Sequence, residues 1–121
     1  MTHKDLVDIV AKAWNTLDAK LIEPYLSDDF YYESVWVFET MKGKDAYMDY
    51  LTGLFDAIRR TNSIVAAKAL FQYPIGEYVI AMVQDGIRDA AIQIWEQSGL
   101  ITHMWMRPID LLPRVIEWMV K

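Results

Sequence analysis

At 121 residues and 14.1 kDa, with 54% hydrophobic residues, the chain is too apolar for a disordered protein and is expected to form one domain over residues 1–121, including an amphipathic C-terminal tail at 109–121. Its formal net charge of −5 at pH 7 disfavours nucleic acid and membranes as partners, because nucleic acid and anionic lipid both bind mainly through clustered lysine and arginine. Zero cysteines and two histidines exclude a disulfide framework, a thiolate nucleophile and a histidine-only metal cluster, so we predict no metal and no cofactor.

Apolar residues at three- and four-residue spacing predict a first helix over about 2–15, with Thr2 as its N-cap. Asp18 can cap a shorter second helix, in which Pro24 predicts irregular turns because it has no backbone N–H to donate. Aromatic and β-branched residues then predict a strand over about 30–38.

Residues 44–60 carry the apolar face of a long packed helix, and Gly53 within it is expected to mark close packing against a sheet. The pattern then changes to that of strands, which are predicted over 63–73, 77–84, 87–96 and 100–107. Hairpin-length separators connect these strands, which indicates an antiparallel meander. After Pro108, helical spacing predicts a final helix, and a strand over 115–120 is the alternative.

The first residues are charged and run straight into an amphipathic pattern, so they lack the apolar stretch of a signal peptide. No run approaches the roughly 20 apolar residues that are needed to span a bilayer. The expected location is therefore cytoplasmic.

Four segments of turns and caps mark this pattern: Trp14-Asn15-Thr16-Leu17-Asp18, Tyr25-Leu26-Ser27-Asp28-Asp29-Phe30, Gly43-Lys44-Asp45 and Ser98-Gly99-Leu100-Ile101. In this order they resemble the nuclear transport factor 2-like superfamily, specifically its SnoaL-like branch, over the chain up to about Pro108. The fold that the resemblance implies is α+β, with N-terminal helices packed into a curved antiparallel sheet that forms a cone with a central pocket. The superfamily includes ketosteroid isomerases, polyketide cyclases and many non-catalytic domains, so the fold alone does not give the function.

The resemblance also implies where isomerase chemistry would lie. Ketosteroid isomerases use an aspartate base on the first long strand, a tyrosine in the first helix and a protonated aspartate on the penultimate strand. The matching positions here are Ser34, Val10 and Ala91. Because none of these side chains can replace the missing group, ketosteroid isomerase activity is disfavoured.

Strand alternation assigns a set of apolar, aromatic and neutral polar side chains to the interior of the cone, as is typical of a pocket for a flat hydrophobic molecule. The predicted pocket residues are Tyr32, Ser34, Trp36, Gln93, Trp95, Met104 and Met106, with Ala91 beside Gln93. The alternative is that these side chains fill the cone as core, since cavities and cores are built from the same residue types.

Residues of the opposite parity are expected on the outer face of the sheet, where they form a more apolar surface than an exposed sheet normally carries. The predicted interface residues are Ile92, Ile94, Ile101, His103 and Trp105. We therefore expect a homodimer packed sheet to sheet, a partner that the resemblance also implies.

Three further polar residues are candidates for chemistry. Glu33 is expected to point away from the cone as a solvated or interface residue rather than to act as a general base. Asp45 is expected to stabilise the start of a helix, and His103 to be paired or stacked in an interface rather than catalytic. A nucleophile, base and orienting group cannot be assembled from them, so the catalytic residues stay unknown.

Two functions are compatible with these patterns. The first is a small-molecule-binding domain whose cone encloses a small apolar or aromatic ligand, with lyase, isomerase or hydrolase activity left open, and Trp36 and Trp95 favour it. The second is a non-catalytic dimerisation or protein-interaction module, which the missing catalytic set and the apolar outer face favour. Of the two, we favour the small-molecule-binding domain.

Overall fold

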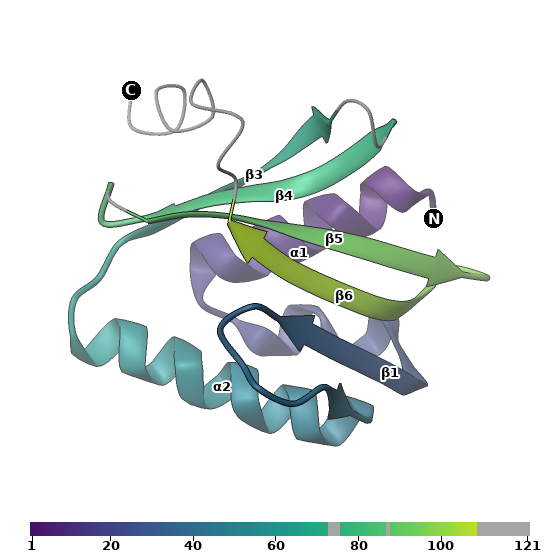
Figure 1. Ribbon diagram of the computed structural model, residues 1–121, viewed down its shortest axis with the longest axis horizontal. Helices are drawn as coiled ribbons and strands as arrows, with labels where there is room; N and C mark the ends of the chain where they lie inside the picture. Colours follow the sequence, from purple (N-terminus) through teal and green to yellow (C-terminus); the bar gives the residue numbers. More distant parts are fainter. Residues whose placement is uncertain (73–75, 87, 109–121) are drawn as a thin grey trace.

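The computed structural model describes residues 1–72, 76–86 and 88–108, so the tail predicted at 109–121 and the end of the strand predicted over 63–73 lie outside the described residues. Figure 1 shows how the elements are arranged. In chain order they are α1 (His3–Thr16), the 3-10 turns η1 (Ala19–Leu21) and η2 (Glu23–Tyr25), β1 (Leu26–Ser34), β2 (Met41–Lys42), α2 (Lys44–Arg60), β3 (Val65–Gln72), β4 (Glu77–Gln84), β5 (Arg88–Gln97) and β6 (Leu100–Pro108). The two long predicted helices are confirmed, and Pro24 lies in an irregular turn as expected.

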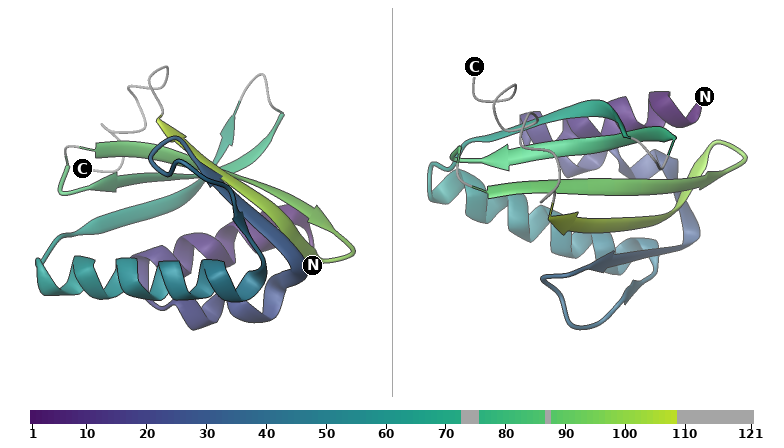
Figure 2. Two further views of the ribbon diagram at one scale, coloured as in Figure 1. Left: turned by 60° about the horizontal axis from the view of Figure 1, so that its bottom comes forward. Right: turned by 45° about the horizontal axis from the view of Figure 1, so that its top comes forward.

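The six strands form one curved sheet in the order β2-β1-β6-β5-β4-β3, and both α-helices lie on one side of it (Figure 2). Strands β3 to β6 form the predicted antiparallel meander. The curved sheet is mostly antiparallel, as predicted, and the parallel pairing of β1 with β6 makes it mixed. Parallel neighbours need a long connection, and here α2 and the four strands β2 to β5 supply it. The chain is α+β, as predicted.

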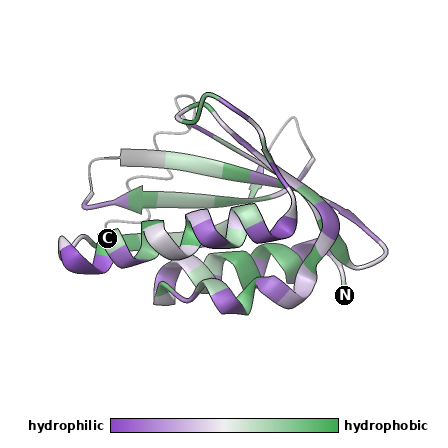
Figure 3. Ribbon diagram, turned by 90° about the horizontal axis from the view of Figure 1, so that it is seen from below, coloured by the Kyte–Doolittle hydropathy of each residue, from purple (hydrophilic) through white to green (hydrophobic). Residues whose placement is uncertain are grey.

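Both helices are amphipathic, and Figure 3 shows hydrophobic and hydrophilic residues alternating along them. Helix α1 begins at the predicted N-cap, because the Thr2 hydroxyl accepts a hydrogen bond from Asp5 N at 3.1 Å and Thr2 N donates to the Asp5 carboxylate at 2.9 Å. Near its other end, Trp14 packs edge to face on Phe55 of α2, with ring centroids 4.9 Å apart. In the described part of the chain, neither helix has the length and apolar character needed to cross a membrane.

Two glycines of the α2 segment have different roles. Gly43 precedes the helix with φ of +97°, a conformation that side-chain-bearing residues rarely adopt. Gly53 lies on the exposed side of the helix, and a β-carbon built there would meet no atom within 4 Å. The close packing predicted at Gly53 was therefore wrong.

A β-bulge in β6 changes which of its residues face the helices. Trp95 pairs with His103 and Glu96 pairs with Ile101, so Thr102 is an extra residue opposite β5. The Thr102 hydroxyl donates a hydrogen bond to the backbone oxygen of Trp95 at 3.3 Å, so the side chain of the extra residue also contacts β5. Because one extra residue inverts the alternation of a strand, Ile101 faces the helices although His103 does not.

Candidate ligand-binding site

A pocket opens between the helices and the concave face of the sheet. Its cavity volume is about 120 Å³, below the roughly 300–1,000 Å³ of sites for drug-sized ligands, so it suits only a small molecule. Both helices, the four strands β3 to β6 and the end of β1 contribute to its lining. The described lining residues with a polar group are Trp14, Ser34, Trp36, Tyr50 and Gln84, and the others are apolar.

Three of the predicted pocket residues, Ser34, Trp36 and Met106, line this pocket. Tyr32 and Met104 lie deeper in the core of the cone and are 2% and 0% exposed. The hydroxyl of Tyr32 donates to the sulfur of Met106 at 3.6 Å. Tyr32, Ser34, Met104 and Met106 therefore share the concave side of the sheet, whereas Trp36 lies beyond the end of β1.

The facing predicted for β5 was wrong. Gln93 and Trp95 lie on the outer face, while Ile92 and Ile94 are almost fully buried in the core. The pairing of β4 with β5 gives the reason, because it places Ile92 opposite the core residue Ile80, and paired residues share a face. Two large isoleucines therefore fill the cone at the positions that had been assigned to Gln93 and Trp95.

The predicted dimer interface is corrected by the same finding. Ile92, Ile94 and Ile101 are buried within the chain, at 0%, 1% and 0% exposure, so they cannot form a surface for a partner. His103 and Trp105 do lie on the outer face. The reason for the error at Ile101 is the bulge at Thr102, which sequence alternation does not reveal.

Strand β1 ends at Ser34, four residues before its predicted end. Trp36 N donates to the Ser34 hydroxyl oxygen at 3.1 Å, and Val37 N donates to the Ser34 carbonyl oxygen at 3.1 Å, so Ser34 starts a turn. This turn brings Trp36 to the pocket while leaving it 51% exposed. Phe38, which the longer strand would have placed in the cone, is fully exposed.

Three tyrosines cluster beside the pocket, with the ring of Tyr32 centred 4.9 Å from that of Tyr47 and 5.8 Å from that of Tyr50. Burial raises the pKa of all three phenols. The tyrosines are therefore protonated at neutral pH and can donate hydrogen bonds.

The indole N–H of Trp14 is a buried donor without a partner. Trp14 lines the pocket and is 5% exposed, and no described residue accepts a hydrogen bond from its Nε1. An unpaired buried donor costs about 1–3 kcal/mol, so its presence beside a pocket calls for a physical reason. A ligand acceptor would remove this cost.

The sequence patterns did not identify Trp14 and Tyr50 as pocket residues. The sequence places Trp14 in the apolar stripe of the first helix and in the turn segment that follows, without assigning it to the pocket. Tyr50 carried a usable signal, since it lies four residues before Leu54 on the apolar face of the helix, and both line the pocket.

No described lining residue carries a formal charge. Of the positions that match the isomerase catalytic set, Ser34 lines the pocket, Val10 is buried in the core, and Ala91 is buried on the outer side of the sheet. The neighbours of Ala91 that do face the cone, Ala90 and Ile92, also lack a carboxylate. The described lining therefore offers no general base.

Three stacked rings cross the outer face of the sheet. The His103 ring lies between those of Tyr31 and Trp95, with centroids 4.0 and 4.2 Å away. Its Nε2 lies 3.1 Å from Glu33 Oε1, without the alignment of a hydrogen bond. Burial lowers the pKa of His103 below its ordinary value of 6.5, and the Glu33 carboxylate offsets part of this shift. His103 and Glu33 thus interact with each other on the face opposite the pocket.

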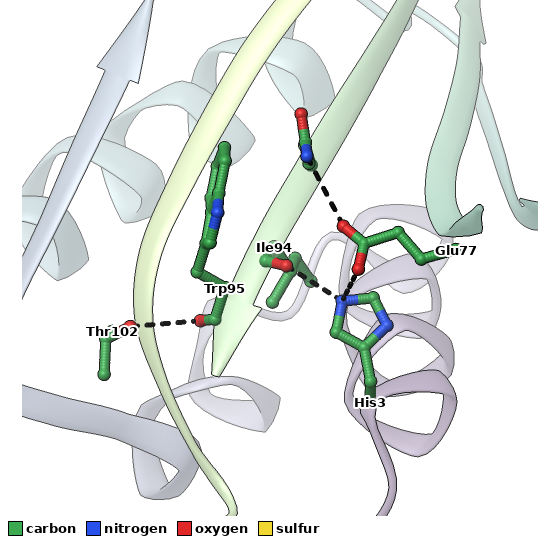
Figure 4. A network of polar contacts seen from close by, with 6 residues as sticks. His3, Glu77, Ile94, Trp95 and Thr102 are labelled. Carbon is green, nitrogen blue, oxygen red and sulfur yellow. Dashed lines mark hydrogen bonds and ion pairs between the residues drawn. The ribbon is translucent and has the colours of Figure 1, made fainter. Parts of the chain in front are cut away.

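The other histidine ties the start of α1 to the sheet, as Figure 4 shows. His3 Nε2 lies 2.8 Å from the backbone oxygen of Ile94 and 3.8 Å from Glu77 Oε2. Gln93 donates to the second carboxylate oxygen of Glu77 at 3.4 Å. Neither histidine lines the pocket, and Asp45 is an exposed residue in the first turn of α2.

Comparison with known proteins agrees with this geometry. No family model matches the sequence, and no curated protein matches it. Among solved structures, a SnoaL-like protein of unknown function from Burkholderia thailandensis matches with a TM-score of 0.69 at 13% identity, over 91% of this chain and 99% of that one. The chain has the nuclear transport factor 2-like fold.

Two further solved structures share this fold. An NTF2-like protein of unknown function from Cytophaga hutchinsonii matches with a TM-score of 0.65 at 16% identity, over 89% of this chain and 90% of that chain. An LEH-like epoxide hydrolase from M. tuberculosis matches with a TM-score of 0.58 at 17% identity, over 84% of this chain and 74% of that chain. At these identities the matches confirm the nuclear transport factor 2-like fold, and this fold hosts unrelated functions.

Proposed function

We propose that this protein binds a small, mostly apolar aromatic molecule in the cone pocket. The pocket lining carries the proposal, since it combines aromatic and apolar side chains with neutral polar groups and includes no charged side chain among its described members. Such a lining binds by burying apolar surface and by a small number of directed hydrogen bonds. An epoxide hydrolase-like protein with the same fold supports a small-molecule use of the cone.

The absence of a charged group among the described lining residues makes binding a better proposal than acid–base catalysis. A general base must reach its proton directly or through one water. Glu33 faces the other side of the sheet and pairs with His103, so it does not meet this condition. A lyase, isomerase or hydrolase reaction stays a prediction without an assigned residue, and the cytoplasmic location likewise stays a prediction.

Titration with methyl naphthyl ketone, followed by tryptophan fluorescence, tests the proposal because Trp14 and Trp36 line the pocket. We expect saturable binding of one molecule per chain. Ala90 also lines the pocket, and Ala90→Leu should weaken binding by about tenfold, since overpacking costs about 1–3 kcal/mol. Ala46→Leu on the exposed side of α2 is the matched control. Absence of saturable binding, or binding that Ala90→Leu leaves unchanged, would contradict the proposal.

A second candidate function is homodimerisation through the outer face of the sheet. The stacked rings favour it, because Tyr31 and Trp95 are each 38% exposed and lie beside His103 and Trp105. Exposed aromatic side chains gathered on one face are typical of the centre of an interface. The remaining members of the earlier interface prediction are thus His103 and Trp105.

Light scattering at micromolar concentration tests this candidate. We expect twice the monomer mass for the wild-type chain and the monomer mass for Trp105→Glu, with Lys12→Glu on the exposed side of α1 as the matched control. A monomeric wild-type chain would rule out the sheet-to-sheet dimer.

A further inference from the structure

The polar groups of the pocket differ in whether they can still form a hydrogen bond with a ligand. The Trp14 indole is a donor only, and its N–H has no described partner. Ser34 is partly occupied, since its hydroxyl oxygen accepts a hydrogen bond from Trp36 N at 3.1 Å. The described pocket therefore has spare donors in Trp14 and Tyr50, and the side-chain amide of Gln84 can both donate and accept.

Tyr50 is the best placed of the spare donors. It is half-buried on α2 and lines the pocket. Burial raises the pKa of the Tyr50 phenol, so its hydroxyl keeps its proton at neutral pH and can donate it. The Tyr32 hydroxyl donates its proton to the sulfur of Met106, and the Tyr50 hydroxyl donates a hydrogen bond to no described residue, so the Tyr50 proton remains for a molecule in the pocket.

The described lining also disfavours a charged ligand. A carboxylate or ammonium group that enters a mostly apolar pocket loses its hydration, and it needs an opposite charge to offset that loss. The lining offers none among its described residues. A neutral ligand with an acceptor oxygen loses less hydration and can accept a hydrogen bond in return.

We infer that the ligand is an uncharged, flat molecule with one carbonyl-type oxygen, and that this oxygen accepts a hydrogen bond from the hydroxyl of Tyr50. The inference rests on the proposed function and adds to it the chemical class of the ligand. The indole N–H of Trp14 is the second donor available to the same ligand.

Three probes of similar shape test the inference: methyl naphthyl ketone, ethylnaphthalene and naphthoate. Titrated by calorimetry, the wild-type chain should bind the ketone about three- to tenfold more tightly than ethylnaphthalene, the usual effect of one net hydrogen bond, and naphthoate most weakly. Tyr50→Phe should reduce ketone binding to that of ethylnaphthalene and leave ethylnaphthalene binding unchanged. Tyr25→Phe removes a hydroxyl that does not line the pocket and should keep the preference for the ketone.

The infrared carbonyl band of the bound ketone gives a second measurement that needs no variant. We expect it at lower frequency than in an alkane solvent, as for a hydrogen-bonded carbonyl. Equal binding of ketone and ethylnaphthalene by the wild-type chain, tightest binding of naphthoate, or a carbonyl band at the alkane position would each overturn the inference. Failure of all three probes to bind would instead overturn the proposed function.

Discussion

The side-chain amide of Asn15 pairs with the backbone of Ala67 as a neighbouring strand would. Asn15 Nδ2 donates to the Ala67 oxygen and Ala67 N donates to Asn15 Oδ1, each at 2.7 Å. Strand β3 is the last of the sheet, so this side of Ala67 has no strand to pair with. Asn15 thereby satisfies two edge groups and fixes the end of α1, next to Trp14, against the sheet that forms the pocket.

Replacing this amide should weaken the fold. We expect Asn15→Ala to lower the free energy of unfolding by about 1–3 kcal/mol, because it removes two hydrogen bonds and leaves part-buried backbone groups unpaired. Urea unfolding measures the change. Lys12→Ala, at an exposed position of the same helix, should change it by no more than about 0.5 kcal/mol. Equal effects of the two substitutions would contradict the role assigned to Asn15.

The sequence predicted those parts of the fold that depend on local chemistry. Thr2 caps α1 because its hydroxyl and the Asp5 carboxylate are three residues apart. Ser98 and Gly99 have φ values of +55° and +81°, which suit a two-residue turn between β5 and β6. These residues act through their immediate neighbours in the chain, so their effects can be inferred without knowledge of the tertiary structure.

The errors came from features that depend on pairing between distant segments. The bulge at Thr102 exists only in relation to β5, and it reversed the facing of Ile101. The inward facing of Ile92 follows from its partner Ile80 on β4. Trp36 reached the pocket through a turn at Ser34, although its aromatic and β-branched neighbours favoured a longer strand. The composition of the pocket was therefore easier to predict than the strand that supplies each side chain.

Two glycines in the α2 segment should respond in opposite ways to alanine. Gly43→Ala forces a β-carbon into a conformation with φ of +97° and should destabilise the fold by about 1–2 kcal/mol. Gly53→Ala adds a methyl group to an exposed helical position with free space and should stabilise it by about 0.5–1 kcal/mol. Thermal unfolding of the two variants checks both signs. A loss of stability in Gly53→Ala would show that this glycine does contact the sheet.

His103 should make stability depend on pH. Burial lowers its pKa below the ordinary value of 6.5, so the unfolded chain binds more protons than the folded chain between the lowered pKa and about 6.5. The contribution of this residue to stability is therefore complete above that window and is lost as the pH falls through it. We expect the urea concentration at the unfolding midpoint of the wild-type chain to fall as the pH is lowered from about 7.5 to about 5.5, a range of about one unit on either side of 6.5.

A pair of variants separates His103 from the other titrating groups. His103→Gln should lose part of the pH dependence, whereas His3→Gln removes the only other histidine and should retain the part due to His103. Identical pH profiles for wild type and His103→Gln would contradict the prediction. Glu33→Gln should widen the window, because the Glu33 carboxylate raises the pKa of His103 against the effect of burial.

Ser34 is where an introduced carboxylate would test the neutrality of the pocket. Ser34 is 9% exposed and lines the pocket with no charged side chain among the described residues. Ser34→Asp keeps an acceptor for Trp36 N, since aspartate forms the equivalent turn. Burial should raise the pKa of the new carboxyl above its usual value of about 3.9. Between that value and the raised pKa, the folded variant then binds more protons than the unfolded one.

The sign of the effect is opposite to that of His103. Relative to wild type, Ser34→Asp should lose stability as the pH rises from about 4 toward the raised pKa, because ionisation then requires a charge within an apolar site. Ser34→Asn has nearly the same shape without an ionisable group, and its difference from wild type should not vary with pH. Urea unfolding between about pH 4, near the pKa of the unfolded carboxyl group, and about pH 8 measures the stability of both variants. A stability difference for Ser34→Asp that is independent of pH would show that the carboxylate finds water or a cation there, and the pocket would then suit charged ligands as well.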